Sequence, residues 1–147
     1  MYRNIPKMLS SVADMDVLII EDAKPLAFLL TKYLKKLGYR KIHCCENGTL
    51  GIRKFQELVE SNNVPIVFLD YYLPDLDAQV VLKRILKIHP GTEVIVETVA
   101  NQNESGIKRL FELGAHEYFP KPYEPKKLET IMDTLQADAD PELITTN

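Results

Sequence analysis

Five short apolar runs alternate with five longer segments of helical pattern along this chain of 147 residues, and this alternation constrains the fold more than any other feature. Short runs rich in β-branched and aromatic residues predict buried strands, whereas apolar residues at helical spacing predict helices that cover a core. Strict alternation favours a parallel sheet with helices on both faces, because each crossover is right-handed and packs back on the sheet. We expect strands over about 17–21, 42–45, 65–70, 93–98 and 116–119, and helices over about 25–37, 48–60, 78–88, 104–113 and 125–136.

Proline and glycine mark the limits of these elements. Pro25 stands in a first helical turn, and Gly38 and Gly114 follow the ends of expected helices. A chain of this length suits one domain with a single core. We expect that domain over residues 15–137, with residues 1–14 as an N-terminal extension and residues 138–147 as a polar tail or the start of a linker.

Composition describes an ordinary globular chain, with 46% hydrophobic and 27% charged residues. The net charge of −3 and the pI near 5.6 give no electrostatic reason to expect direct binding of nucleic acid or of an anionic membrane. No run of about 18 apolar residues could span a bilayer, and no apolar core of a secretory signal is present, so we expect a cytoplasmic protein. The neighbouring Cys44 and Cys45 are the only cysteines, and we expect free thiols with one of them buried.

Acidic residues close two of the expected strands. Asp70 ends the third run, and Glu21 and Asp22 follow the first. Asp is also common in turns for its local hydrogen bonds, so a solvated turn is the alternative interpretation of Asp70 alone. Parallel strands, however, present their carboxyl ends at one edge of the sheet, where open α/β proteins keep their chemistry. The same edge would collect Thr98 and Lys121 from the ends of the fourth and fifth strands.

Three carboxylates that lie close together repel one another, and this repulsion indicates a nearby cation. Two like charges about 4 Å apart cost roughly 4 kcal/mol at an effective dielectric of about 20. Mg²⁺ is the natural candidate, because it prefers oxygen ligands and is typically held by one or two carboxylates with a phosphate oxygen. With Lys121 as a mobile positive charge and Thr98 as a hydroxyl donor, the set is typical of phosphoryl transfer to Asp70.

Further motifs accompany these residues in a fixed order. The whole set is Glu21-Asp22, Asp70 with Leu73-Pro74 and Asp77, Thr98, Leu113-Gly114-Ala115, and Tyr118-Phe119-Pro120-Lys121-Pro122. It resembles the CheY-like receiver domain of two-component response regulators, over about residues 16–135. The resemblance implies a flavodoxin-like, doubly wound (βα)5 three-layer sandwich with a parallel five-stranded sheet of order 2-1-3-4-5. It also favours a cis peptide bond between Lys121 and Pro122.

The resemblance implies that Asp70 accepts a phosphoryl group from a phosphohistidine. The donor would be a sensor histidine kinase or a histidine phosphotransfer protein, the partners that the family implies for this chain. By the same pattern Mg²⁺ would be held by Glu21, Asp22 and Asp70, with help from the backbone carbonyl of Tyr72. Lys121 would pair with the phosphoryl oxygens.

The resemblance also implies a switch that reports this phosphorylation. Thr98 would move to hydrogen-bond a phosphoryl oxygen, and the ring of Tyr118 would turn inward. The surface of the fourth helix, the fifth strand and the fifth helix would then change, and a partner would bind the new surface. A homodimer through this surface is a further expectation.

Several residues depart from the family pattern. Glu21 stands where aspartate is commoner, and Ala78 and Val99 replace smaller residues, so they could slow the chemistry. Glu97 is a charge inside an apolar strand, and we expect it to reach the solvated rim of the sheet, because unpaired glutamate is rarely buried. We also hypothesise that the ring of Tyr72 shields the acyl phosphate from water.

Three classes of function follow from these observations. The leading one is a phosphorylatable receiver, a signalling switch that turns over no external metabolite and is therefore not an enzyme. A pseudo-receiver that binds partners without phosphate is the alternative, which Ala78, Val99 and Glu97 favour and the intact acidic set opposes. A phosphatase of the haloacid dehalogenase type would need a second aspartate at the position of Tyr72. No output domain is apparent after the last helix, so we expect a stand-alone receiver or one domain of a longer protein.

Overall fold

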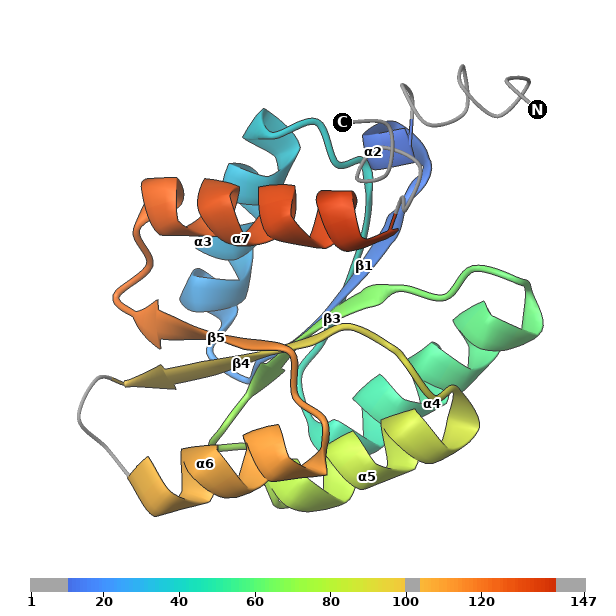
Figure 1. Ribbon diagram of the computed structural model, residues 1–147, viewed down its shortest axis with the longest axis vertical. Coiled ribbons are helices and arrows are strands. Elements are labelled where there is room, and N and C mark those ends of the chain that lie inside the picture. Colours follow the sequence, from blue (N-terminus) through green and yellow to red (C-terminus); the bar gives the residue numbers. More distant parts are fainter. Residues whose placement is uncertain (1–10, 100–103, 140–147) are drawn as a thin grey trace.

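A five-stranded parallel sheet forms the middle layer of the molecule, and helices cover both of its faces (Figure 1). The structure, a computed structural model, describes residues 11–99 and 104–139. Its strands are β1 (Asp16–Ile20), β2 (Lys41–Cys45), β3 (Ile66–Asp70), β4 (Val94–Val99) and β5 (Glu117–Lys121). The described helices are α2 (Ser11–Asp14), α3 (Lys24–Lys36), α4 (Gly48–Glu60), α5 (Ala78–Ile88), α6 (Glu104–Leu113) and α7 (Pro125–Ala139). The strand order β2-β1-β3-β4-β5 confirms the predicted flavodoxin-like fold.

The helices divide into two groups, one on each face of the sheet. Figure 1 shows α3 and α7 on one side and α4, α5 and α6 on the other. Each group covers its own half of the core, because successive residues of a strand point to opposite faces. In β1, for example, Val17 and Ile19 pack beneath α3 and α7, while Leu18 and Ile20 pack beneath the other group. Any polar side chain at a strand end therefore has its face fixed by this alternation.

The central strands carry the strongest sequence signal because they are buried on both faces. Every residue of β1 and of β3 is buried, as expected for inner strands of a parallel sheet. The edge strand β2 has only exposed and half-buried positions instead. This difference corrects one prediction: Cys44 and Cys45 are free thiols as expected, but neither is buried, since Cys44 is exposed and Cys45 is half-buried.

Most elements begin and end within one or two residues of their predicted limits. The helices over 48–60, 78–88 and 104–113 match those limits at both ends. The strand β5 extends to Lys121 rather than ending at Phe119, because Pro120 and Lys121 lie in register with Thr98 and Val99 of β4. The peptide bond between Lys121 and Pro122 is cis, as the family resemblance favours. No helix in the described ranges has the length and apolar character needed to cross a membrane.

The loop after β3 is tied to the start of α4 by one carboxylate. Asp75 accepts hydrogen bonds from the backbone N–H groups of Gly48 (2.8 Å) and Thr49 (2.9 Å) and from the Thr49 hydroxyl (2.7 Å). The first N–H groups of a helix lack partners within the helix, so a carboxylate placed there is favourable. These bonds hold the pKa of Asp75 below its usual range. They also fix the chain that directly follows Asp70.

Candidate functional site

Polar side chains from three strands meet at the carboxyl edge of the sheet. Asp70 and Lys121 are the last residues of β3 and β5, and Glu21 directly follows β1. By the alternation along each strand, all three side chains point to the face covered by α3 and α7. This convergence follows from the parallel arrangement, which brings the ends of separate strands to one place.

An ion-pair network joins these three side chains. The ammonium group of Lys121 lies 2.8 Å from Glu21 Oε1 and 3.2 Å from Asp70 Oδ1. Glu21 and Asp70 are 3% and 4% exposed, so the two carboxylates are almost fully removed from water. Buried ionic groups of this kind need a partner, and here one ammonium group serves both carboxylates.

Asp22 completes a cluster of three carboxylates. One oxygen from each of Glu21, Asp22 and Asp70 lies within 4.8 Å of the other two. Asp22 is exposed, so this side of the cluster opens to solvent. The carboxylates outnumber the ammonium group of Lys121, and their oxygens are the ligands that Mg²⁺ prefers. The residues present therefore fit a hard divalent cation.

Burial and charge shift the pKa values of these groups in opposite directions. Burial raises the pKa of Asp70 to about 7, and the neighbouring Glu21 adds to the rise while Lys121 opposes it. Burial also acts to raise the pKa of Glu21, but hydrogen bonds from Lys121 and from the backbone N–H of Ala23 outweigh it and hold that pKa below its usual range. Desolvation acts to lower the pKa of Lys121, yet its carboxylate partners raise it. Glu21 thus stays ionised beside Lys121, and Asp70 takes up a proton near neutral pH.

Tyr72 follows Asp70 closely and contributes a backbone contact. Its N–H donates to Asp70 Oδ1 over 3.3 Å. Its ring is 53% exposed and packs edge-on against Tyr71, with the ring centroids 4.8 Å apart. The ring is therefore largely exposed to solvent. Ala78, by contrast, is buried at the start of α5 and contacts the core.

Thr98 and Tyr118 belong to the opposite face of the sheet from Glu21, Asp70 and Lys121. Thr98 is 6% exposed, and its hydroxyl donates to the carbonyl of Val99 over 3.3 Å. Tyr118 is 42% exposed and packs edge-on against Phe111 of α6, with centroids 6.2 Å apart, and Lys127 of α7 lies over its ring. Residues 100–103, which connect Val99 to α6, lie outside the described ranges. Tyr118 thus faces outward on the surface of α6, β5 and α7.

The structure contradicts the expectation that Glu97 reaches the solvated rim of the sheet. Its side chain is 0% exposed, and it points to the same face as its register partner Asp70. The hydroxyl of Tyr123, just after β5, donates a hydrogen bond to Glu97 Oε1. Burial raises the pKa of Glu97 well above its usual range. The prediction was wrong because it considered Glu97 without a partner, and the partner lies in a different part of the chain.

Tyr123 is the site residue that the sequence reasoning missed. A charged residue in a buried strand requires a hydrogen-bond partner, and this requirement indicates that Glu97 has one. The spacing along the chain does not say which residue supplies that partner. Burial raises the pKa of Tyr123 far above its usual range, and Glu97 adds to the rise, so its hydroxyl stays protonated and able to donate.

Known proteins share this arrangement of sequence and fold. The family described as the response regulator receiver domain matches residues 17–133. The chemotaxis protein CheY of Thermotoga maritima is 29% identical over 112 residues, which are 76% of this chain and 89% of CheY. The transcriptional regulatory protein SrrA of Staphylococcus aureus is 32% identical over 114 residues, 77% of this chain but only 44% of SrrA. This chain thus spans less than half of that larger relative.

Solved structures show the same fold. A signal receiver domain from Vibrio parahaemolyticus is 27% identical, with a TM-score of 0.72 over 90% of this chain and 98% of that one. The CheY-like receiver domain of Methanospirillum hungatei is 20% identical, with a TM-score of 0.75 over 87% and 98% of the two chains. The receiver domain of the sensor histidine kinase PA1611 from Pseudomonas aeruginosa is 21% identical, has a TM-score of 0.70 over 84% and 98%, and holds a magnesium ion in its active site cleft.

Proposed function

Because this chain belongs to the response regulator receiver domain family, we propose that it is a phosphorylatable switch whose acceptor is Asp70. The observation that carries the proposal is the bridge that Lys121 forms between Asp70 and Glu21 at the carboxyl edge of the sheet. A carboxylate nucleophile, a cation beside it and a cluster of oxygen ligands are the parts that phosphoryl transfer requires. The phosphoryl donor is a phosphohistidine of a histidine kinase or of a histidine phosphotransfer protein.

The transfer forms one bond and breaks one. An oxygen of the ionised Asp70 carboxylate attacks the phosphorus of the phosphohistidine, and a P–O bond forms as the P–N bond breaks. The leaving imidazole keeps the electron pair of the P–N bond, and a proton on its other ring nitrogen makes it neutral. Asp70 must be ionised for this attack, and a divalent cation held by the same carboxylates would favour the ionised form.

The remaining residues of the site neutralise charge on the phosphoryl group. Lys121 already reaches Asp70 Oδ1, so its ammonium group can donate to a phosphoryl oxygen bound there. Glu21, Asp22 and Asp70 would hold Mg²⁺, together with the backbone carbonyl of Tyr72 that the family resemblance implies. When bound, this ion supplies positive charge to the phosphoryl oxygens.

The output of the switch is a change of surface rather than a turnover reaction. We assign it to the surface of α6, β5 and α7, on which Tyr118 and Phe111 are partly exposed. In the phosphorylated state Thr98 hydrogen-bonds the phosphoryl group and Tyr118 turns inward. An effector or a second copy of the chain then binds the altered surface. This function places the chain in the cytoplasm with its kinase, and it involves neither direct nucleic-acid binding nor a membrane.

A beryllofluoride titration separates this function from that of a pseudo-receiver. Beryllofluoride binds an acceptor aspartate as a mimic of the phosphoryl group, and it needs the divalent cation to do so. With Mg²⁺ and beryllofluoride, amide resonances of Thr98 and Tyr118 should shift in the wild type and stay fixed in Asp70→Asn. Unchanged wild-type spectra would refute the phosphorylatable receiver and favour the phosphate-independent binding module.

A further inference from the structure

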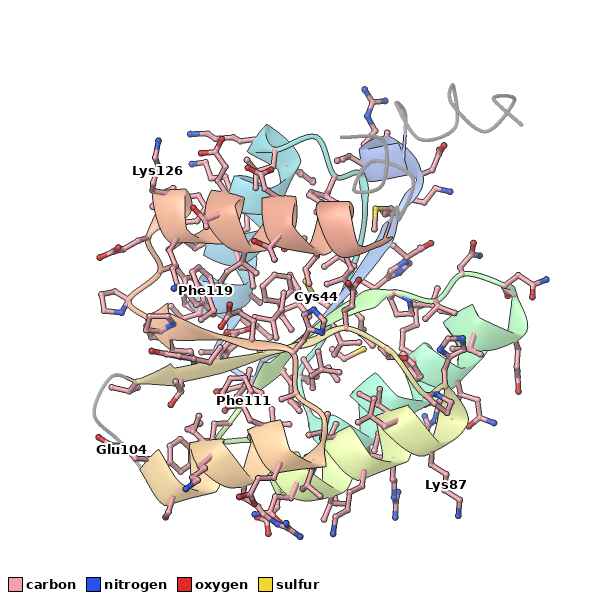
Figure 2. All side chains as sticks on the ribbon, in the orientation of Figure 1. Cys44, Lys87, Glu104, Phe111, Phe119 and Lys126 are labelled. Atoms are coloured by element: carbon pink, nitrogen blue, oxygen red, sulfur yellow. The ribbon has the colours of Figure 1, made fainter. Side chains whose placement is uncertain are left out.

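A buried glutamate and a buried tyrosine form a hydrogen-bonded pair directly behind the carboxylate cluster. Glu97 is 0% exposed and Tyr123 is 6% exposed, and the tyrosine hydroxyl donates to Glu97 Oε1. The ring of Tyr123 stacks on Phe119, with the centroids 4.9 Å apart and the planes within 6°. Figure 2 shows Phe119 between β5 and α7, so the stacked rings lie in the core on this face of the sheet. The pair is therefore packed within the core on this face of the sheet.

The pair also reaches a residue of the candidate cation site. The hydroxyl of Tyr123 lies 3.4 Å from Glu21 Oε1, the same oxygen that accepts from Lys121 over 2.8 Å. The other oxygen, Glu21 Oε2, accepts from the backbone N–H of Ala23 over 3.0 Å. Both oxygens of Glu21 thus have neighbours that fix the plane of the carboxylate.

The hydroxyl of Tyr123 links the pair to Glu21. The hydroxyl of Tyr123 has one hydrogen but two carboxyl groups within reach, Glu97 and Glu21. The tyrosine hydroxyl lies between the two carboxyl groups and joins Glu97 and Glu21 in one polar chain. Buried polar chains of this kind hold their members in a defined geometry.

Stability alone does not account for a glutamate at this place. Glu97 Oε2 has no hydrogen-bond partner among the residues that the structure describes. A buried carboxyl group with an unpartnered oxygen is unfavourable, and apolar residues of similar volume in place of both partners are often neutral or stabilising. An apolar pair at these two positions would therefore stabilise the core at least as well.

We propose that Glu97 and Tyr123 are positioning residues that hold Glu21 in the orientation needed to bind the divalent cation. The proposal rests on the proposed function only in that the cation site is the one formed by Glu21, Asp22 and Asp70. Groups that orient a metal ligand typically change metal affinity about 10- to 100-fold when they are removed. The Tyr123 to Glu21 contact is long, so we expect the lower end of that range, about tenfold.

The test combines Mg²⁺ affinity with stability in a set of matched variants. Calorimetric titration with MgCl₂ gives the affinity, and urea unfolding without Mg²⁺ gives the stability. Tyr123→Phe should weaken Mg²⁺ binding about tenfold, whereas Glu97→Gln, whose carbonyl oxygen can still accept from the Tyr123 hydroxyl, should keep most of the affinity. Tyr33→Phe, which removes a tyrosine hydroxyl from α3 away from the site, is the matched control and should bind as the wild type does.

The double variant Glu97→Leu with Tyr123→Phe separates positioning from structure. It removes both polar partners together, so it should unfold at a urea concentration no lower than the wild type and still bind Mg²⁺ about tenfold more weakly. Wild-type affinity in this variant, or in Tyr123→Phe, would overturn the positioning role and leave the cation site intact. Failure of the wild type itself to bind Mg²⁺ would instead overturn the cation site, and the positioning role with it.

Discussion

Replacing Asp70 with asparagine should stabilise the chain at about pH 8 in the absence of Mg²⁺. Burial raises the pKa of this carboxyl from an ordinary 3.8 to about 7, so the folded state disfavours its ionised form. That difference corresponds to about 4 kcal/mol, at about 1.4 kcal/mol for each pKa unit. Asp70 shares Lys121 with Glu21, whose pKa is lowered, so part of this amount is offset within the network. We expect a gain of about 1–3 kcal/mol for Asp70→Asn.

The stability gained by Asp70→Asn depends on pH, because the pKa of Asp70 is higher in the folded chain than in the unfolded one. Between about pH 4 and pH 7 the unfolded chain has lost the Asp70 proton while the folded chain still holds it, so the free energy of unfolding falls as pH rises. The stabilising contribution of protonated Asp70 is complete below the pKa that this group has in the unfolded chain. It is lost as the pH rises through the pKa that the group has in the folded chain. The advantage of Asp70→Asn should therefore be small at about pH 4, grow through about pH 7, and level off above it.

Urea unfolding followed by circular dichroism, repeated across this pH range, measures the effect. Asp133→Asn is the matched control, since it removes an exposed carboxylate from α7 on the side away from the core. Saturating Mg²⁺ should stabilise the wild type more than Asp70→Asn, because the ion binds only the folded site. An advantage of equal size at every pH, or a loss of stability at about pH 8, would refute the reasoning from buried charge.

Three further substitutions test individual contacts. Asp75→Ala removes the carboxylate that binds two N–H groups at the start of α4, and urea unfolding should show a loss of about 1 kcal/mol. Gly51→Ala places a Cβ atom 2.5 Å from the Ile20 side chain, so the same assay should show a loss of about 1–3 kcal/mol, and a neutral result would contradict the close packing of α4 on β1. Tyr72→Ala removes the exposed ring that we hypothesise to shield the acyl phosphate, so loss of the phosphoryl group from Asp70, followed by mass spectrometry, should become faster; an unchanged or slower rate would remove the shielding role of that ring.

The sequence predicts most of the fold because its strongest signals are local. The run that ends at Asp70 is buried at every position of β3, so its apolar pattern and its following proline identify the strand and its end together. The last strand was predicted too short, because Pro120 is a weak strand former. Its place in β5 comes from pairing with Thr98 of β4, which is a tertiary interaction.

The same distinction between local sequence signals and tertiary packing applies to the candidate site. Residues at strand ends, such as Asp70 and Glu21, could be brought together from topology alone, since parallel strands end at one edge. The burial of Glu97 could not, because its partner Tyr123 depends on how the chain after β5 packs over the sheet. Local pattern fixes which face a strand residue points to. It does not say what lies opposite that face.

Intact-mass measurement after incubation with acetyl phosphate is the most direct test of Asp70 as the phosphoryl acceptor. The wild type should gain the mass of one phosphoryl group when Mg²⁺ is present and should not gain it when the ion is chelated. Asp70→Asn should keep its original mass under both conditions. A gain in both proteins, or in neither, would contradict the assignment of Asp70 as the residue that takes up phosphate.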